Sequence, residues 1–489
     1  MNNQKLSLDE IKAKSIRGIA ALTGRTFLIQ IVTLISTFLL TIFLDPKEYG
    51  IFFLIGAIIN FFVYFSDIGL AAALIQKKDS PNDDELKTTF SIQQLLVVTI
   101  VSLIFLLTPI FKNIFSLDTE AIYLLWALSF SLFLSSLKTI PSVLLERKLD
   151  FNKLIIPQIV ETLFFYTTCV FLAWKGYGIS SFTFAVLIRG FSGLILMYII
   201  EPWMPGFKFS TVALKKLLRF GLPYQLNTFL AVFKDDGMTV ILGTIIGTAG
   251  VGYLAWAQKW ASAPLRFFMD QVIKVTFPAY SRLQDDIHSL SLALNRSVFF
   301  INLLIFPSLL GLVTLAPVLT QVIPKYEKWQ PALLALSLLS VNTILAAITT
   351  PLTNLLNAIG KIKITFRLMI MWTVLTWIFV PALAIKFGFN GAAFGYSIVG
   401  LSSIIAIYVT SKYVAIDFWQ SIIKPFIAAL VMGTLIYLLQ KFLPVSLLSV
   451  FIIITSGVLI YCFVIFLLVG PSIFTDIKKI TRSFKIKND

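Results

Sequence analysis

The residues of this chain that are best suited to chemistry are lysines and arginines inside long apolar segments. Lys234, Lys259, Arg266 and Arg189 each lie well within a stretch that is otherwise mostly apolar. A charge near the middle of a bilayer costs about 2.5 to 3.5 kcal/mol on insertion scales, so each side chain is expected to face protein or a water-filled cavity. Such a set of buried cations favours an anionic ligand.

The segment 251–280 places its charges along one line. Lys259 and Arg266 are seven residues apart, which is about 20° around an α-helix, and Asp270 lies one turn beyond Arg266. A stripe of this kind is not expected to face lipid. Two interpretations stay open: an internal ion pair between Arg266 and Asp270 that stabilises packing, or a cationic wall of a substrate cavity.

Two further segments carry polar groups. In 51–75, Asn60, Tyr64 and Asp67 follow one another at i, i+4 and i+7, which predicts one polar face that lines a cavity. In 222–246, the charged residues at 234, 235 and 236 are consecutive. Their side chains point in different directions, so at least one is expected to pair with a neighbouring helix.

Acidic residues in the apolar segments are candidates for binding a coupling ion. Asp67, Asp235 and Asp236 could each hold a proton or Na⁺, and the sequence does not choose among them. Glu161 is a further candidate, although a structural pair between Glu161 and Arg189 is favoured over a ligand role for Arg189. No cofactor is expected beyond such an ion.

The inventory of other reactive residues excludes several kinds of site. His288 is the single histidine, and Cys169 and Cys462 both lie inside apolar runs. Neither a His/Cys metal site nor a disulfide framework can be built from these residues. We therefore expect no catalytic residue and no metal ligand.

The elements that position these residues are apolar segments long enough to cross a membrane. Of the 489 residues, 58% are apolar and 13% are charged, and the mean hydropathy is +0.90, which indicates an all-α polytopic membrane protein. A spanning helix needs about 20 mainly apolar residues. About fourteen segments qualify: 26–44, 51–75, 90–111, 121–145, 154–174, 181–200, 222–246, 251–280, 298–321, 331–359, 364–385, 391–411, 423–440 and 447–469.

The basic residues predict the orientation. There are 40 Lys and Arg against 24 Asp and Glu, a formal charge of +16. Most of the Lys and Arg fall in alternate connecting segments, which is typical of cytoplasmic loops when both termini are cytoplasmic. The positive charge is therefore read as a topological signal and not as a nucleic-acid site. The first 25 residues are either an amphipathic surface stretch or a disordered basic tail, and the sequence favours neither.

An internal repeat appears at an offset of 202 residues. Arg17 and Leu40 match Arg219 and Leu242, the Thr-Phe-Leu run at 26–28 recurs at 228–230, and Gly50 matches Gly252. The offset spans six segments, so it predicts two parallel six-helix lobes around a central cavity, an arrangement found in secondary transporters. Tyr64 and Arg266 would then be equivalent positions on a shared axis.

The predicted organisation follows from this repeat. The parts are a cytoplasmic N-terminus (1–25), an N-lobe (26–200), a cytoplasmic linker (201–221), a C-lobe (222–411), two additional spans (412–470) and a cytoplasmic basic tail (471–489).

Four stretches resemble elements of the polysaccharide transporter, or oligosaccharide flippase, family of the multidrug/oligosaccharidyl-lipid/polysaccharide exporter superfamily. They are LDPKEYG at 44–50, FSDIGLAAALIQK at 65–77, LERKLDF at 145–151 and FPAYSRLQDD at 277–286. The resemblance implies a flippase of the cytoplasmic membrane that carries polyprenyl-pyrophosphate-linked glycans to the outer leaflet by alternating access, with a basic cavity for the anionic headgroup. Lys234, Lys259 and Arg266 fit that role by position, although no family motif assigns it to them.

Two other functions stay open. A drug or organic-cation exporter of the same fold would prefer an acidic, aromatic cavity, so the basic stripe counts against it. A membrane-embedded glycan polymerase, ligase or acyltransferase usually needs a large outer loop or a histidine and acid constellation, neither of which is predicted. The expected partners are the lipid-linked glycan and membrane lipids, with other glycan-assembly membrane proteins as further candidates.

Overall fold

The computed structural model describes residues 8–470, apart from the side chains of 8–23 and of some positions in 216–230 and 270–271. These described residues form helices joined by short connections, with no strand among them. The predicted basic tail at 471–489 and the first seven residues lie outside this description. The chain divides into two compact units, Met1–Gly252 and Tyr253–Asp489, and each is described by itself.

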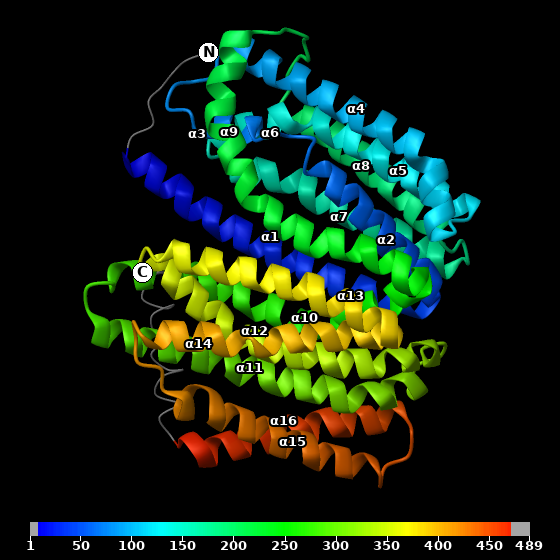
Figure 1. Ribbon diagram of the computed structural model, residues 1–489, viewed down its shortest axis with the longest axis vertical. Helices are drawn as coiled ribbons and strands as arrows, with labels where there is room; N and C mark the ends of the chain where they lie inside the picture. Colours follow the sequence, from blue (N-terminus) through cyan, green and yellow to red (C-terminus); the bar gives the residue numbers. More distant parts are fainter. Residues whose placement is uncertain (1–7, 471–489) are drawn as a thin grey trace. The chain divides into compact units, whose positions relative to one another are not determined.

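The helices are shown in Figure 1. The first group comprises α1 (Leu8–Phe43), α2 (Pro46–Val63), α3 (Leu70–Gln76), α4 (Asp83–Phe115), α5 (Thr119–Leu137), α6 (Thr139–Arg147), α7 (Phe151–Trp174), α8 (Ser180–Ile200), α9 (Thr211–Val232) and the π-helical turn η1 (Phe233–Gly237). The second comprises α10 (Met238–Arg282), α11 (Ile287–Val322), the 3₁₀ turn η2 (Glu327–Ala332), α12 (Leu333–Ala358), α13 (Ile362–Leu401), α14 (Ser403–Ser411), the π-helical turn η3 (Trp419–Ile423), α15 (Lys424–Gln440) and α16 (Leu447–Val469).

The described residues contain 12 helices that are long and apolar enough to cross a membrane, where fourteen are predicted. The difference lies in two long helices that are continuous across a kink, at Gly247 (φ 68°) in α10 and at Gly388 (φ 62°) in α13. At 1.5 Å per residue a 45-residue helix is about 68 Å long, more than twice the hydrocarbon thickness of a bilayer. Both kinks fall where the sequence predicts a break, at 246–251 and 385–391, and glycine tolerates the positive φ that each kink needs. The chain is a multi-pass membrane protein.

In the first unit, α7 packs against both α8 and α1, and α5 packs against α8 and α4. The core forms where apolar residues of α2 meet these helices: Leu54 and Ile55 are fully buried, and the rings of Phe52 and Phe182 stack with their centroids 4.0 Å apart. Cys169 of α7 is buried in the same core. The core therefore joins helices that are far apart in the sequence, and it sets the position of the polar residues on α2, α7 and α8.

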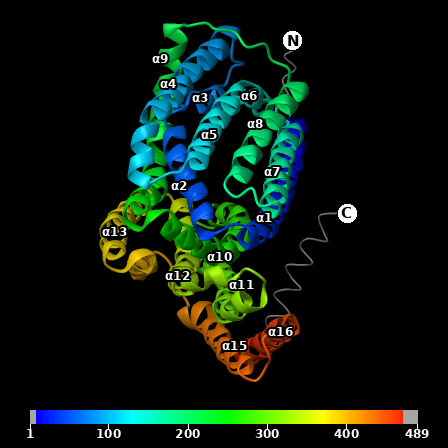
Figure 2. The ribbon, with the colours of Figure 1, turned by 90° about the vertical axis from the view of Figure 1, so that its right-hand side faces the viewer.

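In the second unit, α11 packs against α12 and α15, and α15 packs against α16 (Figure 2). The connection into α15 is tied to α11 by side-chain amides. Asn295 accepts from the backbone N–H of Asp417 at 2.9 Å, and the buried Asn302 donates to the carbonyl of Ser421 in η3 at 3.0 Å. Buried amides that pair with backbone groups stabilise a specific arrangement, because a wrong one would leave them unsatisfied. The last two helices are therefore attached to α11 in a defined register.

The segment predicted as one span at 51–75 is interrupted. Helix α2 ends at Val63, and α3 begins only at Leu70, after Gly69 with φ +79°. A Cβ on Gly69 would overlap the carbonyl of Gly221 in α9, so this position requires glycine for its conformation and for the close approach of the two backbones. Hydropathy alone does not reveal this break, because the residues on both sides of it are apolar.

Candidate functional site

Helix α2 is tied to α9 by a reciprocal pair of hydrogen bonds. The hydroxyl of Tyr64, which directly follows α2, donates to the carbonyl of Gln225 at 2.6 Å, and the Gln225 amide donates to the carbonyl of Tyr64 at 2.7 Å. The rings of Tyr64 and Phe229 pack beside this clamp, with centroids 5.3 Å apart. The clamp satisfies a carbonyl at the C-terminal end of α2, where the helix itself offers no partner.

The same face of α2 meets the charged turn η1. The amide of Asn60 donates to a carboxylate oxygen of Asp236 at 3.5 Å, and Lys234 forms an ion pair with Asp235 at 3.3 Å. The prediction that one of the three consecutive charged residues pairs with a neighbouring helix is met by Asp236. A π-helical turn carries one additional residue and is frequently found at functional sites, which fits three charges in an apolar helix.

Asp67 does not continue the line of Asn60 and Tyr64, because the chain leaves the helix after Val63. Its carboxylate instead accepts a hydrogen bond from the backbone N–H of Leu70 at 2.8 Å, at the beginning of α3. An acidic side chain in this position satisfies a free helix N–H and interacts favourably with the helix dipole. The predicted continuous helical spacing therefore ends before Asp67, and the prediction that Asn60, Tyr64 and Asp67 line a cavity stays a prediction.

A second polar cluster surrounds Glu161 of α7. The carboxylate of Glu161 forms an ion pair with Lys138, which lies between α5 and α6, and its other oxygen lies 3.9 Å from Nε of Arg189 in α8. The Glu161 side chain is 12% exposed and that of Arg189 is 53% exposed. A Cβ on Gly193 would overlap the Glu161 carboxylate, so this glycine provides the space for the cluster. The predicted pair is present, and Lys138 is a second and closer partner of Glu161.

Arg25 extends this cluster from α1. Its guanidinium donates to the side-chain oxygen of Gln158, which lies one turn before Glu161 on α7. Within the described part of the chain, Nε of Arg25 is buried and has no hydrogen-bond partner. The charge pattern predicts Arg25 as an inner-surface residue, and the contact was missed because Gln158 is 133 residues away. The one available signal was that Arg25 directly precedes a long apolar run.

The cationic stripe lies in the second unit. Lys259 is partly buried, Arg266 is more exposed, and the two are close enough for their charges to repel one another. The side chain of Asp270 lies outside the described residues, so the choice between an internal pair with Arg266 and a cavity wall stays a prediction. The proposed equivalence of Tyr64 and Arg266 likewise stays a prediction, since they belong to different units.

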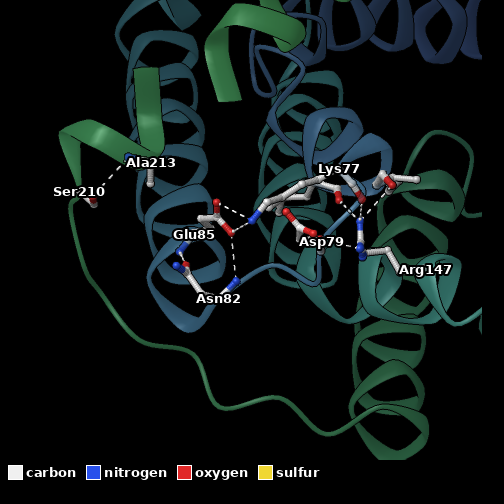
Figure 3. A network of polar contacts seen from close by, with 9 residues as sticks. Lys77, Asp79, Asn82, Glu85, Arg147, Ser210 and Ala213 are labelled. Atoms are coloured by element: carbon white, nitrogen blue, oxygen red, sulfur yellow. Dashed lines mark hydrogen bonds and ion pairs between the residues drawn. The ribbon is translucent and has the colours of Figure 1, made fainter. Parts of the chain in front are cut away.

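A third network closes the turn between α3 and α4 (Figure 3). The guanidinium of Arg147 donates to four backbone carbonyls, those of Leu74 (2.6 Å), Ile75 (3.1 Å), Lys77 (2.7 Å) and Asp79 (2.8 Å). These carbonyls lie in and just beyond the last turn of α3, where a helix has acceptors without partners. The planar guanidinium, with five donors, suits this task, whereas a lysine ammonium does not.

The remainder of this network is a nearly buried ion pair. Lys77 contacts the Glu85 carboxylate at 2.6 Å, and Glu85 also accepts from the backbone N–H of Asn82 at 3.0 Å while Asn82 accepts from that of Glu85 at 2.8 Å. The Asn82 and Glu85 bonds form a capping box at the beginning of α4. Sequence reasoning missed this network, although Lys77 and Arg147 both lie in the stretches that resemble family elements.

Among the side chains that the structure describes, no group of three or more His, Cys, Asp and Glu could hold a metal ion, and Cys169 and Cys462 are both free thiols. The charged groups of α7, α8 and η1 form small clusters through the ion pairs described above.

Comparisons with known proteins agree on one family and one fold. A family model described as "Polysaccharide biosynthesis protein" matches residues 39–334. The lipopolysaccharide biosynthesis protein WzxC of Escherichia coli K12 is 24% identical over 412 residues, which is 81% of each chain. The succinoglycan biosynthesis transport protein ExoT of Rhizobium meliloti is 24% identical over 276 residues, 56% of this chain and 55% of its own.

Two solved structures share the fold. The lipid II flippase MurJ in an inward closed conformation superposes with a TM-score of 0.75 at 17% identity, over 93% of this chain and 99% of its own. An inward-facing multidrug transporter of the MATE family of the MOP superfamily has a TM-score of 0.57 at 16% identity, over 79% and 97%. The chain therefore has the MurJ and MATE type of fold.

Proposed function

Because this chain belongs to the polysaccharide biosynthesis protein family, we propose that it is a flippase that moves lipid-linked oligosaccharide or polysaccharide precursors from the inner to the outer leaflet of the cytoplasmic membrane. The two relatives, a lipopolysaccharide biosynthesis protein and a succinoglycan biosynthesis transport protein, support this proposal. Translocation would follow alternating access, in which one set of helices rocks against another around the cargo.

The observation that carries the proposal is the excess of positive charge within the apolar helices. In the first unit, Lys138 and Arg189 share a single carboxylate, Glu161, and the guanidinium of Arg25 contacts the neutral side chain of Gln158, one turn away on the same helix. Buried cations that outnumber the nearby anions are costly in a bilayer, and an anionic ligand lowers that cost. The pyrophosphate of a polyprenyl-linked glycan has the matching charge, whereas an organic cation would be repelled.

We assign the headgroup to four basic residues, Lys234, Lys259, Arg266 and Arg189, and the lining of the path to Asn60, Tyr64, Asp67 and Asp270. Arg189 is included because its side chain is half exposed and its ion pair with Glu161, at 3.9 Å, is long enough to exchange for a headgroup. Lys234 is partly neutralised by Asp235 and would have to exchange that partner for the headgroup.

The coupling ion, a proton or Na⁺, would bind a carboxylate that does not already pair with a basic side chain or cap a helix. Glu161 contacts two cations, Asp67 caps α3 and Asp235 pairs with Lys234, which leaves these carboxylates poorly suited. Asp236 contacts the neutral amide of Asn60 and is repelled by the neighbouring Asp235. Neutralising Asp236 by an ion would relieve this repulsion, so we place the coupling site there.

Both termini would be cytoplasmic, as the distribution of basic residues predicts. The partners would be the lipid-linked glycan, membrane lipids and other glycan-assembly proteins of the same membrane.

The proposal is tested in liposomes that contain the purified protein and a lipid-linked glycan. We expect glycan that was protected in the inner leaflet to become accessible outside, with its covalent structure unchanged. Alanine at Lys234 and at Arg266 should abolish this transfer while leaving membrane insertion intact. Unchanged transfer by both variants would contradict the proposal that these basic residues bind the headgroup. A covalent change in the glycan would indicate an enzyme.

A further inference from the structure

Two glycines allow the backbones of α2 and α10 to touch near the beginning of α2. A Cβ on Gly50 would overlap the carbonyl oxygen of Thr248 and lie 2.6 Å from the backbone nitrogen of Gly252. A Cβ on Gly252 would overlap the carbonyl oxygen of Pro46 and lie 3.1 Å from the backbone nitrogen of Gly50. The contact is made by main-chain atoms, and no side chain fits between the two helices at this point.

The contact is reciprocal under the repeat found in the sequence. At the offset of 202 residues, Pro46 corresponds to Thr248 and Gly50 corresponds to Gly252. Each glycine therefore meets the carbonyl that is equivalent to the one its counterpart meets. A residue can touch its own equivalent only near the axis that relates two repeats, so the predicted repeat assigns this crossing to its axis. In each helix the carbonyl and the glycine are four residues apart, the spacing by which membrane helices approach closely.

The local structure places two opposing influences at this contact. Helix α2 begins at Pro46, directly after Asp45, and the equivalent of Asp45 is Gly247, at which α10 is kinked. Two helix beginnings are thus brought together, and their positive dipole ends repel one another. The Glu48 carboxylate, which accepts from the backbone N–H of Asp45 at 2.8 Å, offsets part of this repulsion. Close packing of the glycines holds the contact.

We propose that the Gly50 and Gly252 crossing is the closing point of the outer gate, and that these two glycines decide whether the protein can close on that side. This inference rests on the proposed alternating-access function. Under the predicted topology the crossing lies at the outer end of α2, and the Arg147 and Lys77 network lies beyond the inner end. Release of cargo to the outer leaflet requires the two backbones to separate, and the return step requires them to meet again.

The test uses the full chain in membranes, with Cys169 and Cys462 changed to alanine and a reporter, Asn60→Cys, added. Position 60 is ten residues, or about 15 Å, inward of Gly50 along α2. A membrane-impermeant maleimide is applied from the outer side. Gly50→Ala and Gly252→Ala prevent the close contact, so each should raise the labelling rate by about tenfold, as expected when overpacking shifts a two-state equilibrium.

The matched control is Gly56→Ala in the same helix, because a Cβ at Gly56 meets nothing within 4 Å. It should leave the labelling rate unchanged. Labelling of the Gly50 and Gly252 variants at the rate of the Gly56 variant would overturn the proposal. Failure of both variants to insert while the Gly56 variant inserts would also overturn it, because the contact would then serve folding.

The labelling needs no glycan, so the gate and the cargo are tested separately. Faster labelling of the glycine variants, together with no glycan transfer by the unmodified chain in liposomes, would support the gate and refute the flippase proposal. Glycan transfer by the unmodified chain, together with unchanged labelling, would refute the gate alone.

Discussion

Tyr64 and Gln225 hold one another through both of their carbonyls: each side chain donates a hydrogen bond to the backbone oxygen of the other residue, at 2.6 and 2.7 Å. The pair links the end of α2 to α9 across 161 residues of sequence. It also positions Asn60, one turn earlier, beside Asp236. The polar residues of α2 are therefore oriented by contacts that they make with α9 and η1.

Tyr64→Phe should lower the stability of the protein without removing the ring contact with Phe229. The change removes one hydrogen bond, which contributes about 0.5 to 1.5 kcal/mol, and leaves the Gln225 carbonyl without this donor. Thermal unfolding in detergent measures the effect. Tyr123→Phe is the control, since the hydroxyl of Tyr123 makes no hydrogen bond to another described residue. Equal unfolding temperatures for both variants would contradict the role of the clamp.

Glu161→Gln should destabilise the first unit by about 3 kcal/mol, because it leaves Lys138 and Arg189 without their shared counter-charge in a nearly buried site. Lys138→Met in the same background should restore part of the loss, since it removes one of the two unpaired cations. The unfolding of the two single variants and the double variant gives the coupling between the residues. Strictly additive losses would argue against the cluster.

Arg147→Ala should expose the turn between α3 and α4 to proteases. The variant loses donors to four carbonyls, and Arg147→Lys should rescue little because an ammonium cannot span them. We expect tryptic cleavage at Lys77 and Lys78 to become roughly tenfold faster, through local opening. Lys148→Ala is the matched control, because its partner Glu201 lies away from this turn. Comparable cleavage of the two alanine variants would rule out the Arg147 contacts as its cause.

Asp236→Asn should abolish the dependence of glycan transfer on pH or on Na⁺ while the protein still inserts and binds its cargo. An amide mimics the neutral form of the carboxyl group, so the ion has nothing left to neutralise. Transfer rates in liposomes with and without an imposed ion gradient measure this effect. Asp67→Asn, whose side chain still accepts from Leu70, is the comparison and should keep the ion response. If only the Asp67 variant loses its response to the ion gradient, the coupling ion binds at Asp67 and not at Asp236.

Several features were predictable because they depend on neighbours in the sequence. The kinks at Gly247 and Gly388 fall at predicted breaks, since a glycine among apolar residues is a local signal. The capping box of Asp45 and Glu48 and the placement of Pro46 in the first turn are likewise local. The end of α2 before Asp67 was not predictable, because it depends on the close approach of Gly69 to Gly221.

By itself, the sequence determined the class of the protein, the apolar segments, the offset of the repeat and the inventory of intramembrane charges, because these follow from composition and from spacing along one chain. Only the tertiary structure decided which partners those charges have. Lys138 reaches Glu161, Arg25 reaches Gln158 and Gly50 meets Gly252 across 23, 133 and 202 residues, respectively. Contacts of this kind depend on how helices pack in three dimensions. In the apolar interior an unpaired charge is costly, which favours a packing that brings acceptors to cations such as Lys138 and Arg25.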